Sequence, residues 1–207
     1  MNKYVSRTDQ ADRLRIAQEA ARILAEEGVR DFLLAKRKAT ERLGMDPRSR
    51  NLPTNREIEE ALAEHHRLFH ADSHEQRLRE LREAARRAMH LLAPFEPRLV
   101  GGVLSGLAAE YAPVQLHLFA DTPEQVAIHL MERRIQYELD ERRLKQPRGE
   151  GQHYPLYCFM LGDVVIEATV FPYNAIRQAP ASPVDGKPMR RAALAEVEAL
   201  LDEVDQT

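Results

Sequence analysis

The sequence predicts an α+β protein, with a helical N-terminal region followed by a mixed sheet that is flanked by helices. Three observations lead to this expectation. Apolar residues recur at helical spacing through residues 8–92. Residues 114–119 then alternate as V-Q-L-H-L-F, which is typical of a strand. Two further apolar runs, 154–161 and 164–171, are separated by Gly162-Asp163 and predict a hairpin.

The helical region is expected to contain four helices. Their predicted spans are residues 8–27, 31–43, 56–70 and 73–92. We expect Asn55 to cap the third helix. Ser73 is followed three residues later by Gln76, a spacing that predicts a capping box at the start of the fourth. Pro94 and Pro97 should end the helical part.

The region after Pro97 is expected to form the sheet and its covering helices. Beside the three strands already named, the pattern predicts a short apolar segment at 98–104, a helix at 123–134, a strand at 135–144 and a closing helix at 192–204. We therefore expect two domains, a basic helical region over residues 1–72 and an α+β domain over residues 73–207.

The charge distribution is consistent with two modules. Residues 1–95 contain 19 Lys and Arg against 16 Asp and Glu, whereas residues 96–207 contain 11 against 17. The net charge of −3 is too small to indicate a partner by itself. The most basic stretch, residues 30–50, is a candidate for contact with RNA or DNA phosphates.

The compartment is expected to be cytoplasmic. Cys158 is the single cysteine, so it forms no internal disulfide, and its apolar neighbours predict a core residue. The N-terminal residues show no signal-peptide pattern, and no segment approaches the roughly 20 apolar residues that cross a bilayer. We expect no membrane contact.

The segment from Leu99 to Phe119 is the one most suggestive of chemistry. A predicted strand ends in a glycine pair, a short stretch follows, and the alternating strand comes next. Glycines at a strand end allow the backbone to approach phosphate groups closely. The candidate nucleotide-binding residues are Gly101, Gly102, Ser105 and Gly106.

This layout resembles the nucleotidyltransferase superfamily, which includes DNA polymerase beta, poly(A) polymerases and antibiotic nucleotidyltransferases. In that family a strand ends in Gly-Gly or Gly-Ser, a second strand alternates apolar residues with two acids, and a later strand adds a third acid. Here Gly101-Gly102, Val114–Leu118 and Glu167 occupy these places, and the resemblance covers residues 75–172. It implies a nucleoside triphosphate ligand and a divalent metal.

Two positions depart from the family pattern. Gln115 and His117 stand where the resemblance would place the metal-binding acids. Magnesium prefers oxygen ligands, whereas histidine suits zinc or manganese better. Two expectations remain open: an altered catalytic site of Gln115, His117 and Glu167, in which His117 and Glu167 hold magnesium, manganese or zinc, or a degenerate site that binds nucleotide or RNA without catalysis.

A third reading assigns function to the helical region. Its first two helices loosely resemble a helix-turn-helix, and the second could present four cations to DNA or RNA. These cations are Lys36, Arg37, Lys38 and Arg42. The sequence leaves open whether the protein is an enzyme, a binding module or a DNA-binding regulator.

Two other polar groups receive structural interpretations. The histidines His65, His66, His70 and His74 are expected to lie on a solvated helix face. The arginines of residues 133–148, Arg142 among them, are expected to protect an edge strand, with contact to a triphosphate as the alternative.

Overall fold

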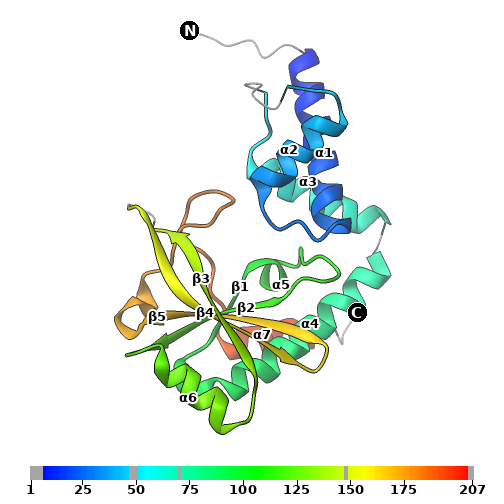
Figure 1. Ribbon diagram of the computed structural model, residues 1–207. Coiled ribbons are helices and arrows are strands. Elements are labelled where there is room, and N and C mark those ends of the chain that lie inside the picture. The colour runs from blue at the N-terminus through cyan, green and yellow to red at the C-terminus, as the bar shows by residue number, and fades with distance from the viewer. Residues whose placement is uncertain (1–6, 47–50, 70, 147–148, 205–207) are drawn as a thin grey trace. The chain divides into compact units, whose positions relative to one another are not determined.

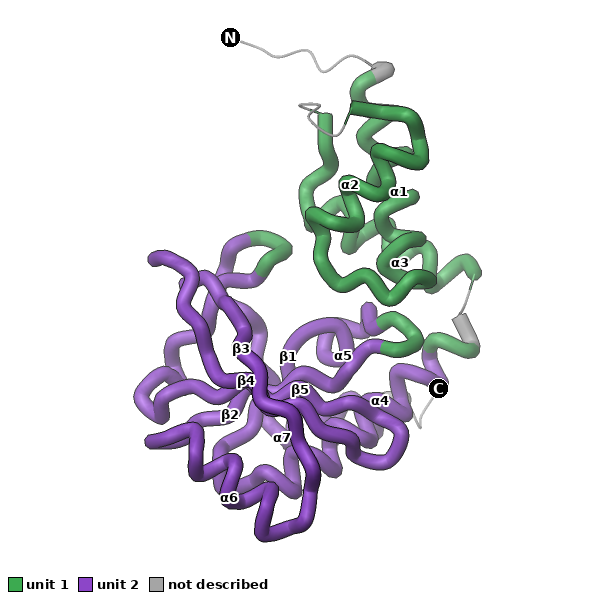
Figure 2. Tube along the Cα trace, viewed as in Figure 1, with its two compact units in different colours: residues 1–74, 109–111, 183–185 green, residues 75–108, 112–182, 186–207 purple. Residues whose placement is uncertain are grey.

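A computed structural model describes residues 7–46, 51–69, 71–146 and 149–204 of the 207-residue chain. The chain divides into two compact units (Figures 1 and 2). The first comprises residues 1–74 with the short segments 109–111 and 183–185, and the second comprises the remainder.

The first unit is helical. Its helices are α1 (Arg7–Glu26), α2 (Phe32–Arg42) and α3 (Asn55–Phe69). Both α2 and α3 pack against α1, and the side chains between them are fully or almost fully buried. The buried apolar residues include Ile16, Ala20, Ile23, Ala35, Ala39 and Ile58. Asp31 caps α2, because its side chain accepts a hydrogen bond from the backbone N–H of Leu34 at 2.7 Å.

Two predicted helix caps are wrong. Asn55 is the first residue of α3, and the cap belongs to Thr54, whose hydroxyl accepts from the Glu57 N–H while the Glu57 carboxylate accepts from the Thr54 N–H. These two reciprocal bonds form a capping box, and the cap lies one residue before the predicted one. Ser73 lies inside α4 (Ala71–Leu91), so it does not begin a helix.

The second unit is built around a sheet of five strands. The strands are β1 (Arg98–Val100), β2 (Val114–Ala120), β3 (Tyr137–Lys145), β4 (Gly151–Leu161) and β5 (Val164–Pro172). The remaining elements after α4 are η1 (Ala93–Phe95), α5 (Gly101–Ser105), α6 (Glu124–Glu132), η2 (Tyr173–Arg177) and α7 (Leu194–Val204). The strand order is β1-β2-β5-β4-β3, and only the β2–β5 pair is parallel.

One face of this sheet carries the main hydrophobic core. Helices α4, α6 and α7 lie over it (Figure 1). Leu116 of β2, Ala168 of β5 and Tyr157 of β4 are cross-strand neighbours on this face, and all three are buried. They pack with Leu81 and Met89 of α4 in one cluster. The buried apolar surface on this face is therefore what fixes the register of the strands.

The predicted fold class is confirmed. The protein is a mixed α/β protein with a helical N-terminal region and a mixed sheet flanked by helices. In the part of the chain that the structure describes, none of the helices combines the length and apolar composition needed to cross a bilayer.

Candidate functional site

The candidate site lies on the sheet face opposite the main core. Successive residues of a strand point to opposite faces of the sheet, so the residues that alternate with the buried core residues point to this second face. A first row of neighbours crosses the strands, formed by Val100, Gln115, Glu167, Cys158 and Glu138. A second row, two residues further along, is formed by Arg98, His117, Thr169, Leu156 and Asp140. Polar and charged side chains are thus concentrated on the face.

Gln115, Glu167 and Arg142 form a hydrogen-bonded chain across this face. The Gln115 Nε2 donates to Glu167 Oε2 at 3.1 Å, and the Arg142 Nη2 donates to the same oxygen at 2.5 Å. Glu167 is only 6% exposed. Burying a carboxylate is strongly unfavourable unless it is paired. The positive charge of Arg142 therefore offsets the cost of burying the Glu167 carboxylate.

The side chain of Arg142 reaches from the edge strand β3 across β4 to β5. Glu167 is its one hydrogen-bond partner among the described residues, through one nitrogen, and about a quarter of the Arg142 side chain is exposed. A guanidinium has five N–H donors. Arg142 therefore has N–H groups that remain open to a ligand while it stays anchored to Glu167.

The turn between β1 and α5 lies against Gln115. Gly101 has φ of +72°, and a Cβ at this position would stand 2.2 Å from the Gln115 Oε1. Only glycine adopts this conformation readily and leaves room for the amide. The predicted glycine pair and the predicted alternating strand therefore do meet, and Gly101 and Gln115 adjoin each other.

The other predicted nucleotide-binding residues have local structural roles. A Cβ on Gly102 would approach the Ala108 backbone at 3.2 Å, so this glycine allows close packing of the loop after α5. The Ser105 hydroxyl donates to the Gly102 carbonyl at 3.3 Å, and Gly106, with φ of +81°, ends α5. Their contact with a nucleotide stays a prediction.

His117 lies on the same face but faces a second arginine. It is 2% exposed, and its Nδ1 accepts a hydrogen bond from the Arg191 Nε at 3.0 Å. Burial, together with the nearby charges of Arg191 and Arg142, holds the pKa of His117 well below its ordinary value. His117 is therefore a neutral imidazole at neutral pH.

Arg191 is anchored on several sides. Its guanidinium carbon lies 4.9 Å from the ring centroids of both Phe119 and Phe171. Its Nη1 donates to the carbonyls of Ala175 and Ile176 in η2, each at 3.1 Å. Burial and the neighbouring Arg98 lower its pKa to about 10. Arg191 thus joins β2 to η2 while remaining charged at neutral pH.

These surroundings do not fit a divalent metal at His117 and Glu167. Each of the two side chains is already bonded to a guanidinium, and a metal ion there would be repelled by both arginines. Gln115 adds only a neutral amide. Within residues 7–46, 51–69, 71–146 and 149–204, no three His, Cys, Asp or Glu side chains are grouped so as to hold a metal ion. The metal remains a prediction, and the donor set does not favour it.

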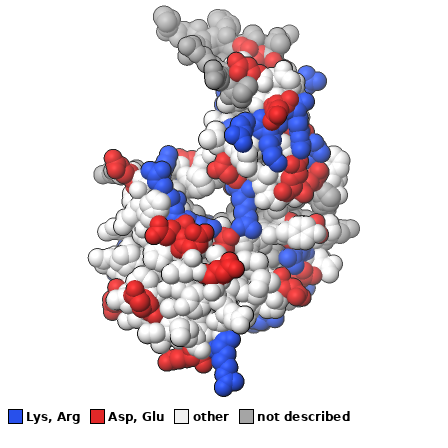
Figure 3. Space-filling model, viewed as in Figure 1, with Lys and Arg blue, Asp and Glu red and all other residues white. Residues whose placement is uncertain are grey.

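The cations proposed for nucleic-acid contact are partly committed to ion pairs within the helical unit. Lys38 pairs with Glu27 at 3.2 Å, and Arg42 pairs with both Glu27 and Glu19. Basic and acidic side chains accordingly intermingle over α1 and α2 (Figure 3). Lys36 is half-buried, and burial lowers its pKa, whereas Arg37 is exposed. Binding of RNA or DNA by these residues stays a prediction.

The histidines at the end of α3 do not all lie on a solvated face. His66 is 7% exposed and its ring stacks on that of His74 at 3.8 Å between centroids. His65 is 3.5 Å from a Glu26 oxygen and packs beside Phe69. The expectation of a solvated face is therefore wrong for His65 and His66, while His70 is outside the described residues.

The sequence does not predict the two arginines that define this site. Arg191 belongs to no motif, and Arg142 is expected mainly to protect an edge strand. The available signal for Arg142 was its position on the same face of β3 as Glu138, because strand alternation places them together. For Arg191 the sequence offered no comparable pattern, since it lies 74 residues from His117 and follows an irregular segment.

Comparison of the chain with protein-family models, with curated proteins and with solved structures found no match.

Proposed function

We propose that this protein binds a nucleotide on the polar face of its sheet, at a nucleotidyltransferase-like site that lacks the paired carboxylates. The observation that carries the proposal is the hydrogen-bonded chain of Gln115, Glu167 and Arg142 beside the Gly101 turn. A guanidinium held in place by a carboxylate is a suitable partner for phosphate, because its planar donors match the phosphate oxygens.

The charge at this site is supplied by arginines. Arg142 neutralises Glu167, and Arg191 and Arg98 place further positive charge beside the neutral His117. Phosphates bound near Arg142 would therefore be stabilised without a divalent ion. The proposal is accordingly binding without nucleotidyl transfer, which agrees with the engagement of His117 and Glu167 by arginines.

The test is thermal unfolding of the full chain with ATP, GTP, CTP and UTP, first in EDTA and then with magnesium, manganese or zinc. A ligand that binds only the folded state stabilises it by about 2.7 kcal/mol at 100 times its dissociation constant. We expect stabilisation by nucleotide in EDTA. Stabilisation that needs a metal, or transfer of a labelled nucleotidyl group, would instead favour the altered catalytic site, and no stabilisation would refute nucleotide binding.

Three substitutions on β3 localise the binding. Arg142→Gln should weaken nucleotide affinity at least about tenfold, since a charge-assisted bond to an anion contributes about 1.5–3 kcal/mol. Arg143→Gln is the matched control, because Arg143 is exposed and points to the other face. Arg142→Lys keeps the positive charge but loses the planar pair of N–H donors, so it should give an intermediate affinity for nucleotide. Equal losses at positions 142 and 143 would place the ligand elsewhere.

A further inference from the structure

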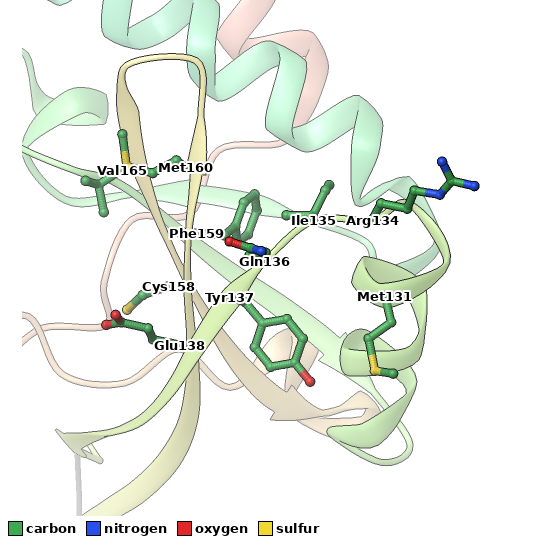
Figure 4. A pocket seen from close by; sticks show the side chains of 10 residues that line it. All are labelled: Met131, Arg134, Ile135, Gln136, Tyr137, Glu138, Cys158, Phe159, Met160 and Val165. Atoms are coloured by element: carbon green, nitrogen blue, oxygen red, sulfur yellow. The ribbon is translucent and has the colours of Figure 1, made fainter.

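An open pocket adjoins the polar row at the outer strands of the sheet (Figure 4). Its volume is about 1060 Å³. The lining residues are Met131, Arg134, Ile135, Gln136, Tyr137, Glu138, Cys158, Phe159, Met160 and Val165. Glu138 and Cys158 belong to the first row of the candidate site, so the pocket continues directly from it.

The pocket contains an exposed apolar pair on the same face as the candidate site. Met160 and Val165 are cross-strand partners, and they are 53% and 39% exposed. They lie two residues along β4 and β5 from Cys158 and Glu167, which is about 6.7 Å along a strand. An exposed apolar pair beside a polar site is suited to the flat face of a heterocycle, which methionine contacts favourably.

Glu138 provides a carboxylate beside this pair. It is exposed, and among the described residues it makes no ion pair or hydrogen bond through its carboxylate. In Figure 4 its carboxylate lies next to Cys158, while the side chain of Arg134 points away from it. An ionised carboxylate only accepts hydrogen bonds, and its two oxygens can accept a pair of parallel N–H donors.

The charges across the face give a bound nucleotide one orientation. Arg98, Arg191 and the guanidinium of Arg142 lie toward β1, β2 and β5, whereas Glu138 and Asp140 lie on β3. Phosphates are attracted to the first side and repelled from the second. Glu138 is two strand spacings from Glu167, about 9.6 Å, a separation that a base and its sugar together can span.

From this arrangement we infer that the pocket is a nucleobase subsite that selects guanine, an inference that rests on the proposed nucleotide binding. The Watson–Crick edge of guanine presents two adjacent donors, the N1–H and the 2-amino group, which match the Glu138 carboxylate. Adenine presents an acceptor beside its amino group, so one oxygen of Glu138 would face a lone pair. Met160 and Val165 contact the face of the base.

Isothermal titration of the full chain with GTP, ITP, ATP and inorganic tripolyphosphate, in EDTA, tests the inference. GTP should bind about tenfold more tightly than ITP, which lacks the 2-amino group, and more tightly than ATP. Glu138→Gln should remove this preference without weakening the binding of tripolyphosphate. Asp140→Asn, on the same face but outside the pocket, should keep the preference.

The outcomes separate the two proposals. Binding of tripolyphosphate and of all nucleotides with equal affinity would overturn the guanine subsite and leave the phosphate site standing. A guanine preference that survives Glu138→Gln would also overturn it. If neither tripolyphosphate nor any nucleotide binds, both proposals are refuted.

Discussion

Arg191 donates a hydrogen bond from its Nε to the Nδ1 of His117 at 3.0 Å, inside a cluster that includes Phe119 and Phe171. A guanidinium has no acceptor, so the bond requires a lone pair on Nδ1. Protonation of Nδ1 would place two cations in contact within a buried site. The folded structure therefore requires His117 to be neutral.

The stability of the protein should decrease as the pH falls below about 6.5, the ordinary pKa of histidine. The folded state holds the pKa of His117 below this value, so the unfolded state binds the extra proton first. The contribution of neutral His117 to the free energy of unfolding is complete above pH 6.5. It is lost as the pH falls toward the folded-state pKa, at no more than about 1.4 kcal/mol per pH unit.

Urea unfolding of the wild type and of His117→Gln between pH 5 and pH 7.5 measures this effect. Glutamine can still accept from Arg191 through its Oε1, but it does not titrate. We expect the difference in unfolding free energy between the two proteins to narrow on acidification. A difference that stays constant with pH would show that the pKa of His117 is the same in the folded and the unfolded state.

The second prediction concerns Arg191 as the link between β2 and η2. Arg191→Met keeps an apolar side chain between the phenylalanines but removes the bonds to His117 and to the carbonyls of Ala175 and Ile176. We expect a loss of about 1–3 kcal/mol in unfolding free energy, because buried acceptors are left unpaired.

Hydrogen exchange should also become faster in η2 of Arg191→Met. The control is Arg190→Met, whose exposed side chain lies 3.9 Å from Glu196 and does not enter the cluster. Equal exchange in η2 for both variants would exclude Arg191 as its anchor.

The third prediction separates the backbone role of Gly101 from its contact with Gln115. Gly101→Ala should cost about 1–2 kcal/mol through the left-handed conformation, and its Cβ should displace the Gln115 amide from Glu167. Gly162→Ala is the matched control, since Gly162 has φ of +64° and nothing within 4 Å of an added Cβ.

Both glycine variants should therefore lose stability, Gly101→Ala the more because it also disturbs the bond from Gln115 to Glu167, and only Gly101→Ala should lose nucleotide affinity. Calorimetric unfolding and titration with nucleotide measure the two quantities. A loss of affinity in Gly162→Ala as well would mean that the effect comes from general destabilisation.

The fold class was predictable because it depends on local patterns. Alternation in β2 places Gln115 and His117 on one face, and the same period places Glu167 with them once β2 and β5 pair in register. The pairing itself depends on the buried core face, which the apolar residues of each strand encode.

The charge partners at the site could not be predicted in the same way. The arginine that reaches Glu167 lies 25 residues away on an edge strand, and the one that reaches His117 lies 74 residues away. Ion pairs of long side chains depend on tertiary placement and not on a sequence period. At the start of α3, both Thr54 and Asn55 are suitable caps, and the outcome was decided by Glu57, three residues after Thr54.

The last prediction concerns that capping box. The Glu57 carboxylate accepts from Arg13 and from the backbone and hydroxyl of Thr54, and these bonds lower its pKa to about 2. Because the folded-state pKa is depressed, the contribution of Glu57 is present above its ordinary pKa of about 4.3 and is lost as the pH falls toward 2.

Thr54→Ala should destabilise the helical unit by about 1 kcal/mol at pH 7, the usual effect of removing an N-cap. Glu57→Gln should destabilise it at pH 7 and differ less from the wild type near pH 3, because the unfolded wild type has by then bound a proton at Glu57 and the folded state has not. Glu60→Gln, an exposed position on the same helix, should match the wild type at both pH values. Far-ultraviolet circular dichroism during urea unfolding gives these differences. If Glu57→Gln and Glu60→Gln behave alike at pH 7, the ion pair of Glu57 with Arg13 contributes nothing measurable, and if Thr54→Ala matches the wild type, the capping box does not stabilise α3.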